Sequence, residues 1–120
     1  MSASGTEVVY VNEWNFEAEV LGSSEPVLID VTAAWCAPCK LAAPIVKELA
    51  RLHAGRLKVV EVDGGESPEL ATRLGVRGFP TFLGVVGGEV VERRLGFSGA
   101  RGLNELAATL LATAPARTAV

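Results

Sequence analysis

Short apolar runs alternate along the chain with segments in which apolar residues recur every three or four positions. The first pattern predicts strands at residues 8–11, 27–32, 57–62, 81–86 and 89–95. The second predicts amphipathic helices within 12–21, from the segment after residue 36 to 53, and at 67–74 and 98–111. Strand, helix and strand in succession imply right-handed βαβ units with parallel strands. The order therefore predicts an α/β domain, a central sheet with helices on both faces.

Local signals refine these elements. Asn12, Ser67 and Ser98 are suited to cap helix starts, and a Gly-Gly pair at 87–88 predicts a two-residue hairpin between the last two strands. The charges of the second hairpin arm, among them Arg93-Arg94, suit a sheet edge. In the long central helix the expected apolar face is the set Leu41, Ile45, Leu49 and Leu52, and Pro44 predicts a kink.

Length and composition indicate one globular domain. The chain has 120 residues, of which 49% are hydrophobic and 21% charged. A formal net charge of −3 gives no attraction to nucleic acid or anionic lipid. The N-terminus has neither a basic nor an apolar leader region, and no run has membrane-spanning length, so we expect a cytoplasmic protein. We expect residues 1–7 to be flexible, 8–111 to form the domain and 112–120 to fray.

The only two cysteines, Cys36 and Cys39, stand three residues apart where a strand passes into a helix. In a helix's first turn they lie on one face, close enough to form a disulfide or to pass a bond between them. In a reducing compartment such a pair is more often catalytic than structural, although a structural disulfide is the simple alternative. A zinc site needs about four ligands, and the single histidine, His53, lies at the far end of the helix, so we expect no metal.

The positions of the cysteines predict a division of labour. Unpaired N–H groups and the helix dipole favour the thiolate of Cys36, which makes it the nucleophile. Cys39, one turn deeper, would attack the mixed disulfide and release the reduced substrate. Asp30, on the preceding apolar strand, would have a raised pKa and could take and return the proton of Cys39; a merely structural buried carboxylate is the alternative.

A wider set of motifs follows a fixed order and spacing along the chain. The set comprises Asp30, the box W-C-A-P-C-K at 35–40, Pro44, G-V-R-G-F-P-T at 75–81, the G-G-E hairpin and Gly96. With these motifs the sequence resembles the thioredoxin family over residues 8–111. The resemblance implies a five-stranded mixed sheet flanked by four helices, and a cis peptide before Pro80. It also implies disulfide exchange with protein substrates, without a bound cofactor, and electrons from an NADPH-dependent thioredoxin reductase.

The same motifs outline a substrate surface. Pro80, if cis, would present its neighbours for pairing with a substrate strand. We expect the flat apolar rim and the box residues to contact substrate, which assigns this role to Trp35, Ala37, Pro38, Gly78, Phe79, Thr81 and Gly96.

The chain departs from the family at three places. Thr32 stands where an aromatic residue is usual, and Glu61 where a lysine often faces the buried aspartate. Glu61 either points inward, so that two carboxylates share an apolar site, or lies in solvent. The dipeptide Ala37-Pro38 adds no charge beside Cys36, which favours a reducing couple.

The main hypothesis is thus a protein-disulfide reductase, expected to be a monomer. One alternative is an interaction module that uses the rim with redox incidental. Another is an oxidising or isomerising relative, which would need an export signal.

Overall fold

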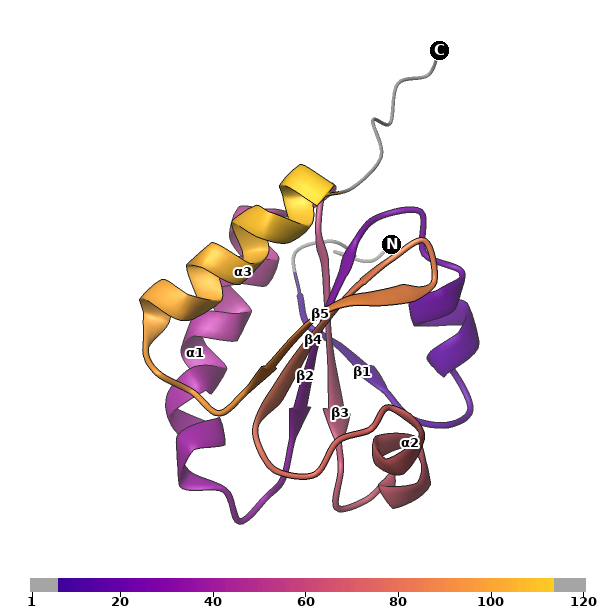
Figure 1. The fold of residues 1–120 in the computed structure, drawn as a ribbon, viewed down its shortest axis with the longest axis vertical. Coiled ribbons are helices and arrows are strands. Elements are labelled where there is room, and N and C mark those ends of the chain that lie inside the picture. The colour runs from indigo at the N-terminus through magenta and orange to yellow at the C-terminus, as the bar shows by residue number, and fades with distance from the viewer. Residues whose placement is uncertain (1–6, 114–120) are drawn as a thin grey trace.

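The computed structural model describes residues 7–113 and contains one five-stranded sheet in the order β1-β3-β2-β4-β5 (Figure 1). Strands β1, β3 and β2 are parallel, whereas β4 is antiparallel to both β2 and β5. The strands are β1 (Val9–Val11), β2 (Val27–Thr32), β3 (Lys58–Asp63), β4 (Thr81–Val86) and β5 (Glu89–Leu95). The helices are η1 (Glu17–Leu21), α1 (Ala37–Leu52), α2 (Pro68–Arg73) and α3 (Ala100–Thr113). The predicted mixed sheet and four flanking helices are confirmed.

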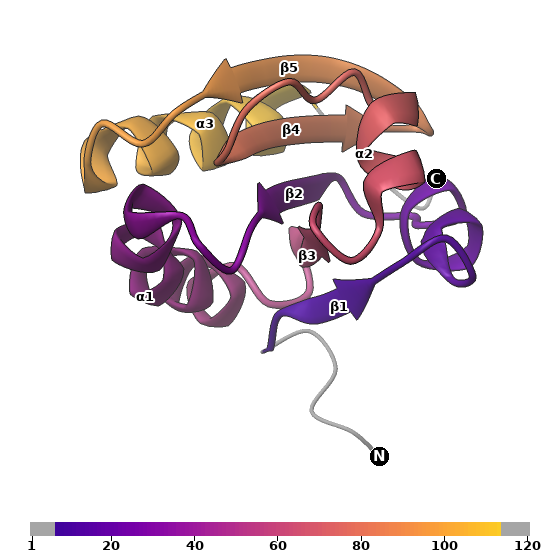
Figure 2. The ribbon, with the colours of Figure 1, turned by 90° about the horizontal axis from the view of Figure 1, so that it is seen from below.

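Two helices cover each face of the sheet. Helices α1 and α3 lie on one side, and η1 and α2 lie on the other (Figure 2). Because side chains alternate along a strand, β2 supplies both cores: Leu28 packs with α1 and α3, and Ile29 packs with η1 and α2. Burial on both faces explains why the central strands are apolar almost throughout.

The buried face of α1 differs from the prediction. Leu41 and Leu52 are exposed, and the residues that turn inward are Cys39, Ala42, Val46, Leu49 and Ala50. Small alanines at the contact let the helix approach the sheet closely, and this shifts the packed face by one position from the row of large side chains. The helix continues without interruption past Pro44.

The N-terminal helix also differs from the prediction. Residues 13–15 form a turn, in which the Asn12 side-chain oxygen accepts the N–H of Trp14 at 2.8 Å and of Asn15 at 3.3 Å. The segment that follows, η1, is a π-helix, closed by a bond from the N–H of Gly22 to the carbonyl of Glu17 at 2.8 Å. Asn12 therefore caps a turn rather than a regular helix, and Trp14 is left exposed.

Three boundaries shape the remaining elements. Gly87 and Gly88 have φ of +61° and +84°, which suits the predicted two-residue hairpin. Helix α3 begins at Ala100, two residues after Ser98, and runs through Thr113, two residues past the predicted end. The expectations for residues 1–6 and for the rest of the tail lie outside the described residues.

Candidate active site at the start of helix α1

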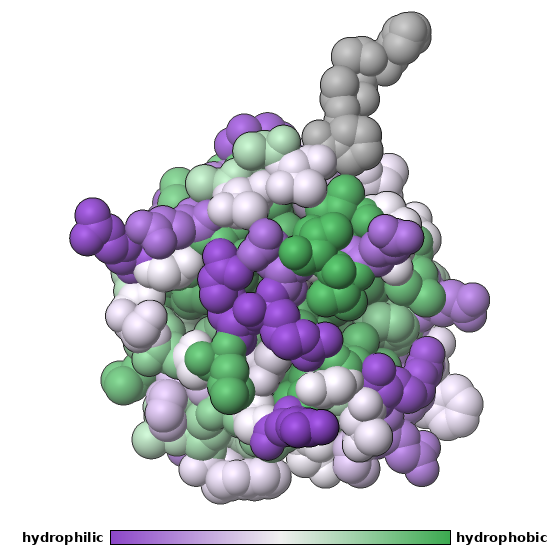
Figure 3. Space-filling model, viewed as in Figure 1, coloured by the Kyte–Doolittle hydropathy of each residue, from purple (hydrophilic) through white to green (hydrophobic). Residues whose placement is uncertain are grey.

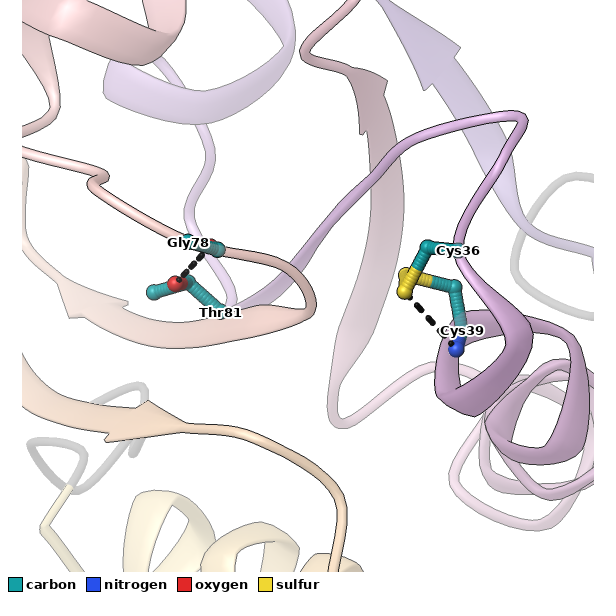
Figure 4. Close-up of a disulfide and its surroundings, with 4 residues drawn as sticks. All are labelled: Cys36, Cys39, Gly78 and Thr81. Carbon is teal, nitrogen blue, oxygen red and sulfur yellow. Dashed lines mark hydrogen bonds between the residues drawn. A yellow bond between two sulfur atoms is a disulfide. The ribbon is translucent and has the colours of Figure 1, made fainter.

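Cys36 is the N-cap of α1 and forms a disulfide with Cys39 (Figure 4). The Cα atoms of the pair are 5.2 Å apart. The Cys36 sulfur also accepts the backbone N–H of Cys39 at 3.2 Å. In the reduced protein this amide and the positive end of the helix would stabilise a thiolate at Cys36. Ala37 and Pro38 form the exposed first turn, where proline is tolerated because no N–H is needed.

Both cysteines are buried, with 7% of Cys36 and 4% of Cys39 exposed. They form a small apolar cluster with Ala33, and Phe79 packs against it. The predicted difference in burial is therefore small in the oxidised form.

Asp30 is a buried carboxyl on β2, with 3% of its surface exposed. It lies on the same side of the strand as Leu28, two residues away, and therefore faces α1. Its Oδ1 atom has no hydrogen-bond partner within residues 7–113. Burial, and to a lesser extent the charge of Glu61, raises the pKa of Asp30 from 3.8 to about 7. A carboxyl with such a pKa can accept and return a proton near neutral pH.

Glu61 lies directly beside Asp30. The two residues are paired in the parallel register of β2 and β3, so their side chains leave the same face of the sheet. Glu61 is half-buried, and burial raises its pKa; the charge of Asp63 acts in the same direction, and that of Lys47 lowers it. Of the two orientations left open by the sequence, the structure shows the one in which Glu61 shares the face of Asp30.

Two aromatic rings, those of Trp35 and Phe79, form part of the rim of the site. Trp35 is 72% exposed and meets Phe79 edge to face, with ring centroids 6.0 Å apart. The rings rest on glycines: a Cβ atom on Gly64 would overlap the Phe79 ring, and one on Gly65 would lie 2.9 Å from the Trp35 ring. Only glycine at these positions leaves room for this arrangement of the rings.

The segment before β4 lies opposite the disulfide (Figure 4). The peptide between Phe79 and Pro80 is cis. The hydroxyl of Thr81 donates to the carbonyl of Gly78 at 2.7 Å, and the N–H of Gly96 donates to the carbonyl of Pro80 at 2.7 Å. The bond between Gly96 and Pro80 holds together two of the segments that contain predicted substrate residues.

Three residues of the site were not predicted from the sequence. Gly64 and Gly65 were not assigned to the site, although a Gly-Gly pair directly after a buried strand is a signal for close packing. Leu95, 71% exposed, has Cδ1 within 3.3 Å of where a Cβ on Gly78 would lie, and so extends the rim. No local pattern indicates that contact.

Among residues 7–113, no group of three or more His, Cys, Asp or Glu side chains is placed to hold a metal ion. No helix in that range has the length and apolar character to cross a membrane.

Comparisons with known proteins agree on one family. The thioredoxin family model matches residues 7–112. Thioredoxin from Thiocapsa roseopersicina is 47% identical over 76 residues, which cover 63% of this chain and 84% of that protein. Thioredoxin M5, chloroplastic, from Oryza sativa subsp. japonica is 42% identical over 90 residues, 75% of this chain but 52% of the rice protein. This chain thus spans about half the length of the rice relative.

A solved structure extends the similarity to three dimensions. A mutant thioredoxin from Halobacterium salinarum NRC-1 superposes with a TM-score of 0.83 at 32% identity. The alignment covers 96% of this chain and all of the other.

Proposed function

The chain belongs to the thioredoxin family, and we propose that Cys36 attacks, Cys39 resolves and Asp30 carries the proton in its reduction of protein disulfides. The fold is the thioredoxin fold, and the chain is a thiol–disulfide oxidoreductase. The observation that carries the residue roles is the pair itself: one sulfur caps a helix, and its partner lies one turn behind it.

In the first step the Cys36 thiolate attacks one sulfur of the substrate disulfide. A bond forms between Cys36 and that sulfur, the substrate S–S bond breaks, and the other substrate sulfur leaves as a thiolate that takes a proton from water. The N–H of Cys39 and the helix dipole support the attacking anion.

In the second step Cys39 loses its proton to the Asp30 carboxylate and attacks the Cys36 sulfur. The mixed disulfide breaks, the second substrate sulfur leaves as a thiolate that takes a proton from water, Asp30 releases its proton to water, and the Cys36–Cys39 disulfide of the structure is formed. Two electrons and two protons have then passed to the substrate. The raised pKa of Asp30 supports its part in this step.

Substrate docks on the rim around the disulfide. The exposed ring of Trp35 and the partly exposed Gly78 and Phe79 support this role, because they present apolar surface beside the disulfide. Thr81 is only 3% exposed, and it contributes through its bond to the carbonyl of Gly78. Ala37, Pro38 and Gly96 complete the surface. The two neutral residues between the cysteines favour a reducing couple.

Regeneration requires an external donor. We assign this role to an NADPH-dependent thioredoxin reductase, which would return two electrons to the disulfide. In this proposal the protein works as a monomer in the cytoplasm, on disulfide-containing proteins.

The test is reduction of insulin by dithiothreitol, with and without the protein. We expect the protein to accelerate precipitation of the insulin B chain, Cys36→Ser to abolish the acceleration, and Cys39→Ser to accumulate a mixed disulfide that a non-reducing gel detects. An inactive wild type, or a fully active Cys36→Ser variant, would refute the proposal. Binding of a partner by a variant that lacks both thiols would favour an interaction module instead.

A further inference from the structure

Arg93 reaches from the edge strand β5 to the loop that follows α2. Its Nη2 donates to the carbonyl of Leu74 at 2.9 Å, and its Nη1 donates to the carbonyl of Gly75 at 3.5 Å. Arg93 pairs with Leu83 of β4, which packs in the η1 and α2 core, so the arginine leaves the sheet on the α2 side. Strand β5 crosses the front of the molecule in Figure 1, and hydrophilic residues gather near the centre of the surface in the same view (Figure 3).

The two carbonyls are free to accept because of how α2 ends. The N–H of Gly75 bonds the carbonyl of Thr72, and the N–H of Val76 bonds that of Ala71, both at 2.9 Å. This is a Schellman ending, with Gly75 at φ +74°. It satisfies carbonyls inside the helix and leaves those of Leu74 and Gly75 pointing outward, where a cation at the negative end of the helix is favourable.

The loop fixed in this way leads to the catalytic site. Residues 76–80 contain neither helix nor strand, and they include Phe79, whose ring packs against the cysteine cluster. The far end is held by the bonds of Thr81 to Gly78 and of Gly96 to Pro80. Arg93 provides the side-chain bonds at the near end.

The next residue provides a natural contrast. Arg94 leaves the strand on the opposite face and pairs with Glu92 of its own strand. No hydrogen bond joins Arg94 to residues 74–80 in the described part of the chain. Adjacent arginines thus carry the same charge in the same strand, but only one of them is bonded to the loop.

We propose that Arg93 is a positioning residue, which holds the 75–80 loop, and with it Phe79 and the backbone beside the disulfide, in the form that binds substrate. The inference rests on the proposed function, because it concerns docking of the disulfide protein. It predicts an effect on substrate binding rather than on the reactivity of Cys36, because Arg93 contacts neither cysteine.

The experiment compares Arg93→Met, Arg93→Lys and the matched control Arg94→Met. Insulin reduction is measured over a range of insulin concentrations, and the rate at which iodoacetamide alkylates reduced Cys36 is measured separately. We expect Arg93→Met to raise KM about fivefold, the ratio that corresponds to the net contribution of one ordinary hydrogen bond. Its kcat and alkylation rate should stay within about twofold of wild type, as should all parameters of Arg94→Met.

Arg93→Lys should have a KM between those of wild type and Arg93→Met, because an ammonium group can donate to one carbonyl but lacks the planar fork that reaches two. Hydrogen exchange gives a second readout: the amides of Arg77 and Gly78 should exchange faster in Arg93→Met than in Arg94→Met. If Arg93→Met fails to fold, the KM and exchange of Arg93→Lys decide the question.

An unchanged KM, an equal change in Arg94→Met, or a loss confined to kcat and alkylation would overturn the role of Arg93. Failure of the wild type itself to reduce insulin would refute the proposed function instead, so the two outcomes are distinguishable.

Discussion

Asparagine at position 30 keeps the size of the buried side chain but cannot ionise, so Asp30→Asn isolates the energetic effect of the charge. In the oxidised protein Asp30 has a pKa of about 7, against an ordinary value of 3.8. The folded pKa lies above the unfolded one. Below about pH 4 the carboxyl is therefore protonated in both states, and its titration has no effect on stability.

Between about pH 4 and 7 the folded protein retains a proton that the unfolded chain releases, so the wild type loses stability as the pH rises. Above pH 7 both states are ionised, and the loss is complete. The interval of about three pH units at 1.36 kcal/mol each gives about 4 kcal/mol. Asp30→Asn should lack this loss. A constant free-energy cost of burying the asparagine amide would displace the variant's plot of unfolding free energy against pH without changing its slope.

The assay is denaturant unfolding of the oxidised proteins from pH 4 to pH 8. The difference in unfolding free energy between Asp30→Asn and wild type should move by about 4 kcal/mol in favour of the variant across this range. Glu66→Gln, which removes an exposed acid after β3, is the control for loss of a surface carboxyl. A difference that does not change with pH would refute the assignment of the raised pKa to Asp30.

Three further predictions concern other contacts. Glu61→Gln should lower the pKa of the neighbouring buried aspartate, by less than burial raises it, and carboxyl ¹³C NMR titration of the oxidised protein measures this. Gly84→Ala would place a Cβ in overlap with Leu110 Cδ2 and should destabilise the fold by about 1–3 kcal/mol in denaturant unfolding. Gly65→Ala would place a Cβ atom 2.9 Å from Trp35 Cζ3, so the tryptophan ring must move. We therefore expect a higher KM for insulin and an unchanged rate of alkylation of the nucleophilic cysteine.

Each prediction has an outcome that contradicts it. An unchanged or raised aspartate pKa in Glu61→Gln would mean that the two carboxylates do not interact. Wild-type stability in Gly84→Ala would mean that α3 moves away without loss of packing. A normal KM in Gly65→Ala would show that the position of the tryptophan ring does not matter for docking.

Most of the fold could be predicted because its signals are local. Apolar runs and turn residues place the strands, and the buried face of α3 follows from helical periodicity. The face of α1 could not be predicted in this way, because two neighbouring rows of its surface are apolar and the sheet selects one. Ala42 and Ala50 pack inward, whereas the larger Leu41 and Leu52 remain outside.

The proximity of Cys36 and Cys39 and the burial of Asp30 could also be predicted, because they follow from spacing and apolar pattern along the chain. The orientation of Glu61 could not be predicted. Side-chain alternation within β3 does not show whether Glu61 lies on the face of the sheet that Asp30 of β2 occupies. The bonds of Arg93 join residues 18 and 19 positions apart and leave no periodic trace. What the sequence could not supply was therefore contact between elements, and that is where the specificity of this site is expected to lie.

The β4–β5 hairpin has a practical consequence. Strand β4 begins at the loop beside the disulfide and ends at Val86, directly before Gly87 and Gly88, so its six residues put the turn roughly 20 Å along the strand from the proposed substrate surface. Apart from Gly87 and its two chain neighbours, no heavy atom of residues 7–113 lies within 4 Å of where a Cβ on Gly87 would be. An affinity handle or a fluorophore on a short insertion between these glycines would leave the reactive end unobstructed, and clients captured by the immobilised protein would meet the same surface as in solution.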